Sequence, residues 1–242
     1  MRIGSTEYWL SLAAVAVATV VVTVAARLWP GRWTTVFARA LGVLLVANQL
    51  SWYVGWNIVE RNPASVQQSL PLGLCEFGTF VVGAALWWQT PLLVEIVYFW
   101  GLGGSLQGLL TPDLPRSDLF PSFFFFQYFI NHGGLVLAPI FLVVGLKLFP
   151  RPGAVLRVAA ITVGYLVVVA GIDWLTGGDY LYLREPPPTV SLLNVLGPWP
   201  WYILSMVGIG VLVLILLNSP FWAMRRLRRR TAQPEPRAVG GT

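Results

Sequence analysis

Cysteine and histidine are almost absent from this sequence, which has one of each, Cys75 and His132, among 242 residues. A single cysteine excludes an internal disulfide and any metal site with several cysteine ligands. A zinc site made of one histidine, one cysteine and carboxylates would need further ligands at typical spacing, and the sequence does not provide them. We therefore expect no metal and no other cofactor.

Charge is also scarce, since only 11% of the residues are charged while 56% are hydrophobic. Soluble domains carry about twice that charged fraction. The composition excludes an ordinary soluble domain and indicates a polytopic membrane protein. The formal net charge of +6 would suggest nucleic acid, but the basic residues lie in short loops and one tail. That distribution is typical of membrane topology, so we expect no nucleic-acid partner.

Long apolar runs predict an all-α bundle of about seven transmembrane spans. The first run follows Arg2 and is longer than the apolar part of a signal peptide, so we expect a retained anchor. The fifth span is over-long, which predicts a tilt, a partly interfacial end or a kink near Pro139. Only the short segment 87–91 joins the third and fourth spans, which predicts an antiparallel hairpin. The predicted spans are roughly 8–28, 35–58, 70–88, 91–110, 121–147, 154–175 and 198–222.

The positions of lysine and arginine predict the orientation of the bundle. Twelve of the 16 basic residues lie in the first loop, the fifth loop and the tail, all on one side of the predicted membrane. Cytoplasmic loops carry the excess of positive charge, so we expect an outside N-terminus and a cytoplasmic C-terminus in the plasma membrane. We predict one transmembrane domain, 1–224, followed by a basic, disordered tail, 225–242, whose arginines lie against anionic headgroups.

Two residues could carry chemistry. Cys75 and Glu76 are embedded near the outer end of the third span, and His132 lies deeper in the fifth. An imidazole that takes the proton of a thiol makes it a good nucleophile, and the thiolate could hold an acyl group as a thioester. Alternatively, Cys75 is a small buried hydrophobe and His132 is held by structural hydrogen bonds. Counting along the helices leaves the two at different depths, so contact between them is allowed but not established.

Five further polar residues are candidates for binding substrate or stabilising an oxyanion. They could instead make interhelical hydrogen bonds, and Asp173 could orient His132, cap its helix or pair with Arg184 or Arg116. Small residues four apart in the fourth span form a helix-packing face, and Gly133 and Gly134 favour close packing over a ligand space. The candidates are Gln107, Asn131, Asn48, Tyr128 and Asp173.

Four strings in order carry a resemblance that covers roughly residues 40–220: LPLGLCEF, EIVYFWGLGGSLQGLLTPD, FFFFQYFINHGG and LGPWPWYIL. They resemble YwaF-type bacterial membrane proteins, which are related to the eukaryotic transmembrane-protein-164 acyltransferases. The resemblance implies acyl transfer between lipids, with a cysteine nucleophile at Cys75 and a histidine at His132. Bacterial members often have a histidine where this chain has Gly73, so His132 is left as the only base.

Together these observations predict a membrane lipid acyltransferase that uses Cys75 and His132 in a cavity open toward the outer leaflet, with membrane phospholipids or other acyl lipids as partners. One alternative is a lipid ester hydrolase on the same residues, with water as the acceptor. Another is a lipid- or solute-binding or transport protein without catalysis, in which Cys75 is inert.

Overall fold

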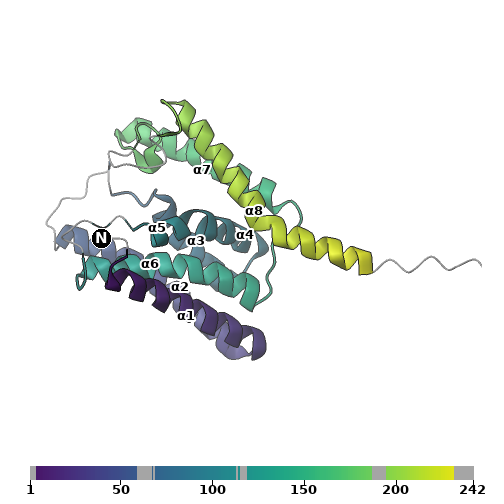
Figure 1. Cartoon of the computed structure of the whole chain (residues 1–242). Helices are drawn as coiled ribbons and strands as arrows, with labels where there is room; N and C mark the ends of the chain where they lie inside the picture. The colour runs from purple at the N-terminus through teal and green to yellow at the C-terminus, as the bar shows by residue number, and fades with distance from the viewer. Residues whose placement is uncertain are drawn as a thin grey trace, which may run out of the picture.

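The computed structural model describes residues 4–58, 67, 69–112, 114, 119–186 and 195–231. Across these residues the chain is helical and has no strand (Figure 1). Two segments, η1 and η3, have π-helical hydrogen bonding, and η4 is a short 3₁₀ turn. In chain order the elements are α1 (Thr6–Leu28), α2 (Arg32–Ile58), α3 (Leu74–Trp88), α4 (Pro91–Trp100), η1 (Gly101–Ser105), α5 (Leu106–Leu110), α6 (Phe123–Ile140), η3 (Phe141–Gly145), α7 (Ala154–Thr176), η4 (Tyr180–Tyr182) and α8 (Trp201–Thr231).

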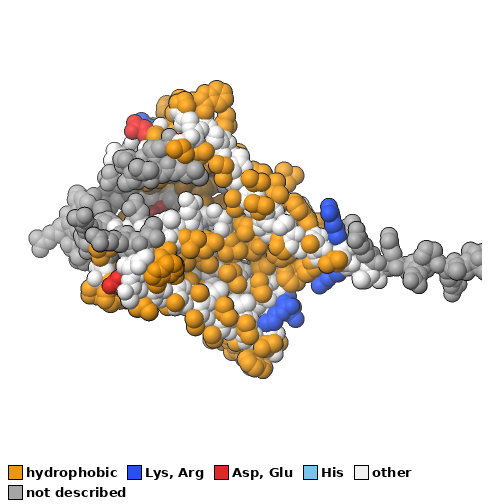
Figure 2. Space-filling model, in the orientation of Figure 1, with side chains coloured by type: hydrophobic (Ala, Val, Ile, Leu, Met, Phe, Trp, Pro, Cys, Tyr) orange, Lys and Arg blue, Asp and Glu red, His pale blue; other side chains and the backbone are white. Residues whose placement is uncertain are grey.

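Six of the described helical stretches are long and apolar enough to cross a membrane, and α3 is a shorter apolar helix of 15 residues. This confirms the predicted all-α bundle of membrane helices. The most apolar windows of α7 and α8 are only 11% buried, whereas the window that spans α6 and η3 is 72% buried. The burial places α6 at the centre of the bundle. Apolar side chains cover much of the outer surface (Figure 2), as expected where helices face lipid.

Helix α6 contacts α1, α2, α3, α4 and α5, and α7 and α8 pack on the other side of the α4–α5 stretch (Figure 1). Two adjacent glycines permit this crowding. A Cβ at Gly133 would lie 2.6 Å from Cγ2 of Val15 in α1, and a Cβ at Gly134 would collide with Leu45 of α2. The packing interpretation of these glycines is supported, since a Cβ at either position would press on a side chain of a neighbouring helix.

The predicted hairpin and the predicted irregularity in the fifth span are both present. Trp88 ends α3, Gln89 caps it in the left-handed conformation, and Pro91 opens α4, because proline is well suited to the first helical turn. In the fifth span Pro139 lies inside α6, and the helix passes into the π segment η3 two residues later. Proline removes a backbone donor, which commonly disturbs the hydrogen-bond ladder at that point.

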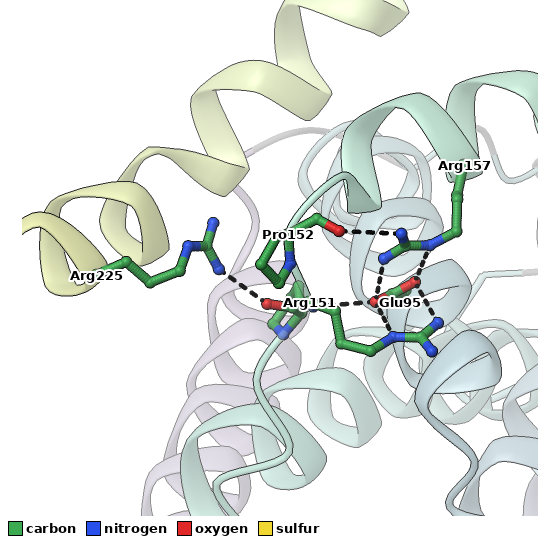
Figure 3. Close-up of polar contacts among 6 residues, drawn as sticks. Glu95, Arg151, Pro152, Arg157 and Arg225 are labelled. Carbon is green, nitrogen blue, oxygen red and sulfur yellow. Dashed lines mark hydrogen bonds and ion pairs between the residues drawn. The ribbon is translucent and has the colours of Figure 1, made fainter.

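A buried carboxylate joins three segments at the basic end of the bundle (Figure 3). Glu95 of α4 is 1% exposed and receives hydrogen bonds from the guanidinium groups of Arg151 and Arg157 at 2.8–3.2 Å. Hydrogen bonding to Glu95 raises the pKa of Arg151. Arg225 of α8 donates to the carbonyl of Pro150 in the same loop. Exposed basic side chains gather at this end and exposed acidic ones at the other in the view of Figure 2, and an excess of positive charge is typical of the cytoplasmic side of a membrane protein.

Helix α8 differs in length from the predicted last span. It continues beyond Trp222 through the run of arginines as far as Thr231, so the first part of the expected disordered tail is helical. Residues 232–242 lie outside the described residues. A helical basic segment that extends from a membrane helix keeps its arginines near the headgroup level.

Candidate functional site

Helix α3 begins deep in the bundle, which places Cys75 in its first turn. Gly73 is the N-cap, so the helix starts four residues later than predicted from the apolar run. The segment that leads to it is held by tyrosines: Leu70 N–H donates to the hydroxyl of Tyr180 at 2.8 Å, and Tyr165 donates to the carbonyl of Leu72 at 2.7 Å. Tyr165 is at the midpoint of α7. Cys75 therefore lies deeper than the predicted helix start suggested, which reduces its difference in depth from His132.

The thiol of Cys75 faces the π segment η1. Its Sγ lies 3.5 Å from Oγ of Ser105, a side chain that is 2% exposed. One turn along α3, the hydroxyl of Thr79 lies 2.8 Å from both the carbonyl oxygen of Cys75 and Oδ1 of Asn131. These contacts fix the first turn of α3 against η1 on one side and α6 on the other.

His132 is oriented by its own helix. Its Nδ1 lies 3.1 Å from the carbonyl oxygen of Tyr128, and its ring stacks on the Tyr128 ring with 4.0 Å between centroids. A carbonyl oxygen only accepts hydrogen bonds, so Nδ1 carries the proton and the lone pair of a neutral imidazole is on Nε2. Nε2 faces Gly108 of α5, where a Cβ would lie 2.9 Å away.

Cys75 and His132 thus meet the same short stretch of chain from two sides. Cys75 contacts Ser105, and His132 packs on Gly108. Ser105 and Gly108 are three residues apart, about one helical turn, so the thiol and the imidazole contact neighbouring positions of the segment 105–108. Among the hydrogen bonds of the described residues there is none directly between Cys75 and His132. Both side chains keep partial accessibility inside the bundle.

The predicted polar candidates separate into two groups. Asn48 and Asn131 are engaged in packing: Asn48 Nδ2 donates to the carbonyl of Gln127 at 3.0 Å, and Asn131 Nδ2 donates to Oε1 of Gln49 at 3.0 Å. The hydroxyl of Tyr128 donates to the carbonyl of Gly108 at 2.7 Å. Gln107 is different, because its side chain is exposed and lines a cavity beside α8.

Asp173 does not belong with His132. Its Oδ1 accepts the backbone N–H of Tyr180 at 2.9 Å, and it is fully buried near the end of α7. The preferred expectation of a pair with Arg184 is wrong, since Arg184 donates instead to Asp179 and to the carbonyl of Gly178. Arg116 lies outside the described residues. The side chain of Asp173 instead holds the turn between α7 and η4, because it accepts the N–H of Tyr180, the first residue of η4, while Gly177 is the C-cap of α7.

Two neighbours of Cys75 were not predicted as site residues. Ser105 was interpreted only as a small packing residue, and its contact with the thiol depends on the π turn of η1. Glu76 was recognised as embedded, but no partner could be assigned to it. Its carboxylate folds back over Gly73, where a Cβ would collide with it. A histidine at that position would have to displace Glu76, which gives a physical reason for glycine here.

No curated protein and no solved structure matches the chain. The sequence model of the TMEM164 family matches residues 3–218, a range that includes Cys75, Ser105, Gly108 and His132. The narrower YwaF-type assignment remains a prediction. The match covers nearly the whole chain, and the protein therefore belongs to the TMEM164 family.

Proposed function

We propose that this protein is a lipid acyltransferase that carries the acyl group as a thioester on Cys75 and uses His132 as its base. The observation that carries the proposal is the convergence of both side chains on the segment 105–108. Cys75 is held at Ser105, and the free lone pair of His132 faces Gly108. A nucleophile and a base oriented by a further group are the usual parts of covalent acyl transfer.

The position of the thiol supports a nucleophilic role. Cys75 lies in the first turn of α3, where unpaired backbone N–H groups and the helix dipole favour a negative charge. Glu76 and His132 are further intramembrane groups that can ionise, and such groups are expensive to keep in a bilayer and mark functional sites. A purely structural cysteine would not require an oriented imidazole that packs on the same segment, 105–108.

In the proposed reaction, Nε2 of His132 accepts the proton of the Cys75 thiol, and the sulfur attacks the carbonyl carbon of a lipid ester. The C–S bond forms, the ester C–O bond breaks, and the leaving alkoxide takes the proton from the imidazolium. The acceptor hydroxyl then gives its proton to Nε2 and attacks the thioester. The new C–O bond forms, the C–S bond breaks, and the thiolate recovers its proton from His132.

The oxyanion of each tetrahedral intermediate needs a hydrogen-bond donor. Of the predicted candidates that carry a side-chain amide, Gln107 is assigned this role, because it lines the cavity together with Leu74, the residue before Cys75. The amides of Asn48 and Asn131 are already engaged between helices, so they act by positioning α2, α3 and α6.

The test is the intact mass of the purified protein after incubation with phospholipid. The wild type should gain the mass of a fatty acyl group, and hydroxylamine should remove it. Cys75→Ser should gain none; because Cys75 is the only cysteine, no other thiol can hold the group. His132→Ala should slow both formation and turnover of the adduct.

Added lyso-lipid separates the two enzymatic outcomes. Transfer of the acyl group to the lyso-lipid supports an acyltransferase, whereas release of free fatty acid under the same conditions would make the protein a hydrolase. The absence of any adduct on the wild type and on His132→Ala would contradict covalent catalysis and favour a binding or transport role.

A further inference from the structure

A cavity of about 470 Å³ lies between the α4–η1–α5 stretch, α7 and α8. Its size is within the range of small-molecule sites. The lining is largely apolar. Most of it comes from these three helical stretches and includes Trp100, Gly104, Val163, Met206, Gly210 and Leu214, and Leu74, Leu181, Tyr182 and Leu196 complete it. The three stretches are long and apolar enough to cross a membrane.

The cavity adjoins the candidate site. Leu74, which precedes Cys75 in the chain, lines it together with Gln107. Gly104 lines it as well, and the next residue, Ser105, contacts the thiol. Leu74 packs directly on Gly104, since a Cβ there would lie 2.6 Å from its Cδ2. The thiol is therefore one residue away from the cavity wall on both α3 and η1.

The cavity is elongated along α8. Its lining extends from Met206 to Leu214, which corresponds to about 12 Å at 1.5 Å per residue. Trp100 and Thr162 both line it, and the indole N–H of Trp100 donates to the hydroxyl of Thr162 at 2.9 Å, which joins α4 to α7. An elongated, largely apolar space suits an alkyl chain and not a polar headgroup, which would lose its hydration there.

We infer that this cavity holds the acyl chain of the lipid substrate and that Gly210 determines how much of a long chain fits. The inference rests on the proposed acyl transfer at Cys75. Gly210 lines the cavity, yet a Cβ at this position meets no atom within 4 Å. A larger side chain at position 210 would therefore occupy the cavity without a clash in the bundle.

A second groove, of about 690 Å³ between α1, α2 and α6, is the alternative position for a chain. Neither Leu74 nor Gln107 lines it. It includes Gly133 and Gly134, but these face Val15 and Leu45 and not the segment 105–108. A chain in that groove would be separated from the Cys75 thiol by α6, which excludes it as the extension of the thioester.

The experiment uses the full-length protein and palmitic acid that carries a diazirine at the end of its chain. After irradiation, labelled peptides are mapped by mass spectrometry in the wild type, Gly210→Leu and Gly208→Leu. Gly208 is the matched control, since it is on the same helix, a Cβ there also meets nothing within 4 Å, and it does not line the cavity.

The wild type should be labelled in α7 and α8 around residues 159–166 and 206–214. Gly210→Leu should lower this labelling by about fourfold for each methylene that it excludes, because burying a methylene in an apolar site strengthens binding by about that factor, and Gly208→Leu should leave it unchanged. Labelling concentrated on the groove between α1, α2 and α6, or equal labelling of the two variants, would overturn the inference.

Acylation of Cys75 by p-nitrophenyl butyrate and by p-nitrophenyl palmitate is measured in parallel. The ratio of palmitoyl to butyryl adduct should fall by about fourfold for each excluded methylene in Gly210→Leu and stay constant in Gly208→Leu. Labelling of the cavity without any adduct on Cys75 would contradict acyl transfer but still support an acyl-chain site in the cavity. Adducts on Cys75 with an unchanged ratio would contradict the role of Gly210 but still support acyl transfer.

Discussion

The imidazole of His132 lies in space that the missing side chain of Gly108 leaves open. A Cβ at Gly108 would be 2.7 Å from Cδ2 and 2.9 Å from Nε2 of His132. On its other side the ring is held by the Tyr128 carbonyl and the Tyr128 ring. Gly108 on the neighbouring helix α5 thus defines the position of His132, the proposed base, as much as the contacts within α6 do.

Gly108→Ala should therefore move His132 without unfolding the protein. The added methyl requires the ring to shift by several tenths of an ångström or to rotate away from the hydrogen bond to Tyr128. A misplacement of about 1 Å at a catalytic group costs about a hundredfold in rate, so acyl transfer should fall by up to that factor. Acylation and turnover rates measure the effect.

Gly78→Ala serves as the control for that variant. Gly78 is a buried glycine in α3 whose Cβ would meet nothing within 4 Å, and alanine favours helix more than glycine does. Its activity and Tm should match or exceed those of the wild type. Full activity of Gly108→Ala would contradict the role given to His132.

Gln107→Ala should remain folded and react slowly. The side chain is exposed and lines the cavity, so its removal leaves no buried group unpaired. Loss of one oxyanion donor typically lowers kcat by about a hundredfold or more. A variant with normal Tm and normal kcat would show that Gln107 does not stabilise the oxyanion.

Asn131→Ala, unlike Gln107→Ala, should lower the stability of the protein. Asn131 is 4% exposed and is within hydrogen-bond distance of both Gln49 and Thr79. Its truncation leaves buried polar groups without partners, at a cost of about 1–3 kcal/mol. Thermal unfolding in detergent should show a lower Tm, and an unchanged Tm would contradict the packing role.

Asp173→Asn should leave the reaction unaffected. The amide oxygen can still accept the backbone N–H of Tyr180, as Oδ1 of the carboxylate does. Asp173→Ala should instead lower the Tm, because that buried N–H loses its acceptor. If Asp173→Asn lowered kcat with an unchanged Tm, the carboxylate would act on His132 after all.

Glu95→Gln should destabilise the basic end of the bundle (Figure 3). The carboxylate is 1% exposed, whereas Arg151 and Arg157 are 47% and 38% exposed, so water compensates part of the lost pairing. We expect the Tm to fall by about 2–6 °C and the activity of the folded protein to persist. Glu185→Gln, at an exposed carboxylate, should change neither quantity.

Several features of the fold could be predicted from local properties of the sequence. Apolar runs predicted the spans, Trp87 to Pro91 predicted the hairpin, and Pro139 predicted the irregular fifth span. The start of α3 was misplaced because the stretch before Gly73 is apolar, and apolarity alone does not separate helix from a non-helical segment held by tyrosines. The correct start at Leu74 changes the depth of Cys75.

The candidate site was predicted only in part, because the sequence shows which residues are present but not which of them face one another. A single cysteine and a single histidine inside apolar spans are visible in any sequence, as are the buried amides. Which of those amides face one another, and which face a cavity, depends on the rotation and depth of helices. Asp173 shows this, since its partner is a turn seven residues later and not an imidazole on another helix.

The sequence by itself determined that this protein is a bundle of membrane helices with very few groups able to do chemistry, because hydrophobicity and residue type act locally. Only the tertiary structure decided that Cys75 and His132 both contact the segment 105–108. These two contacts need the π turn of η1, the missing side chain of Gly108 and the deep start of α3. Each of these features depends on contacts between residues far apart in the chain.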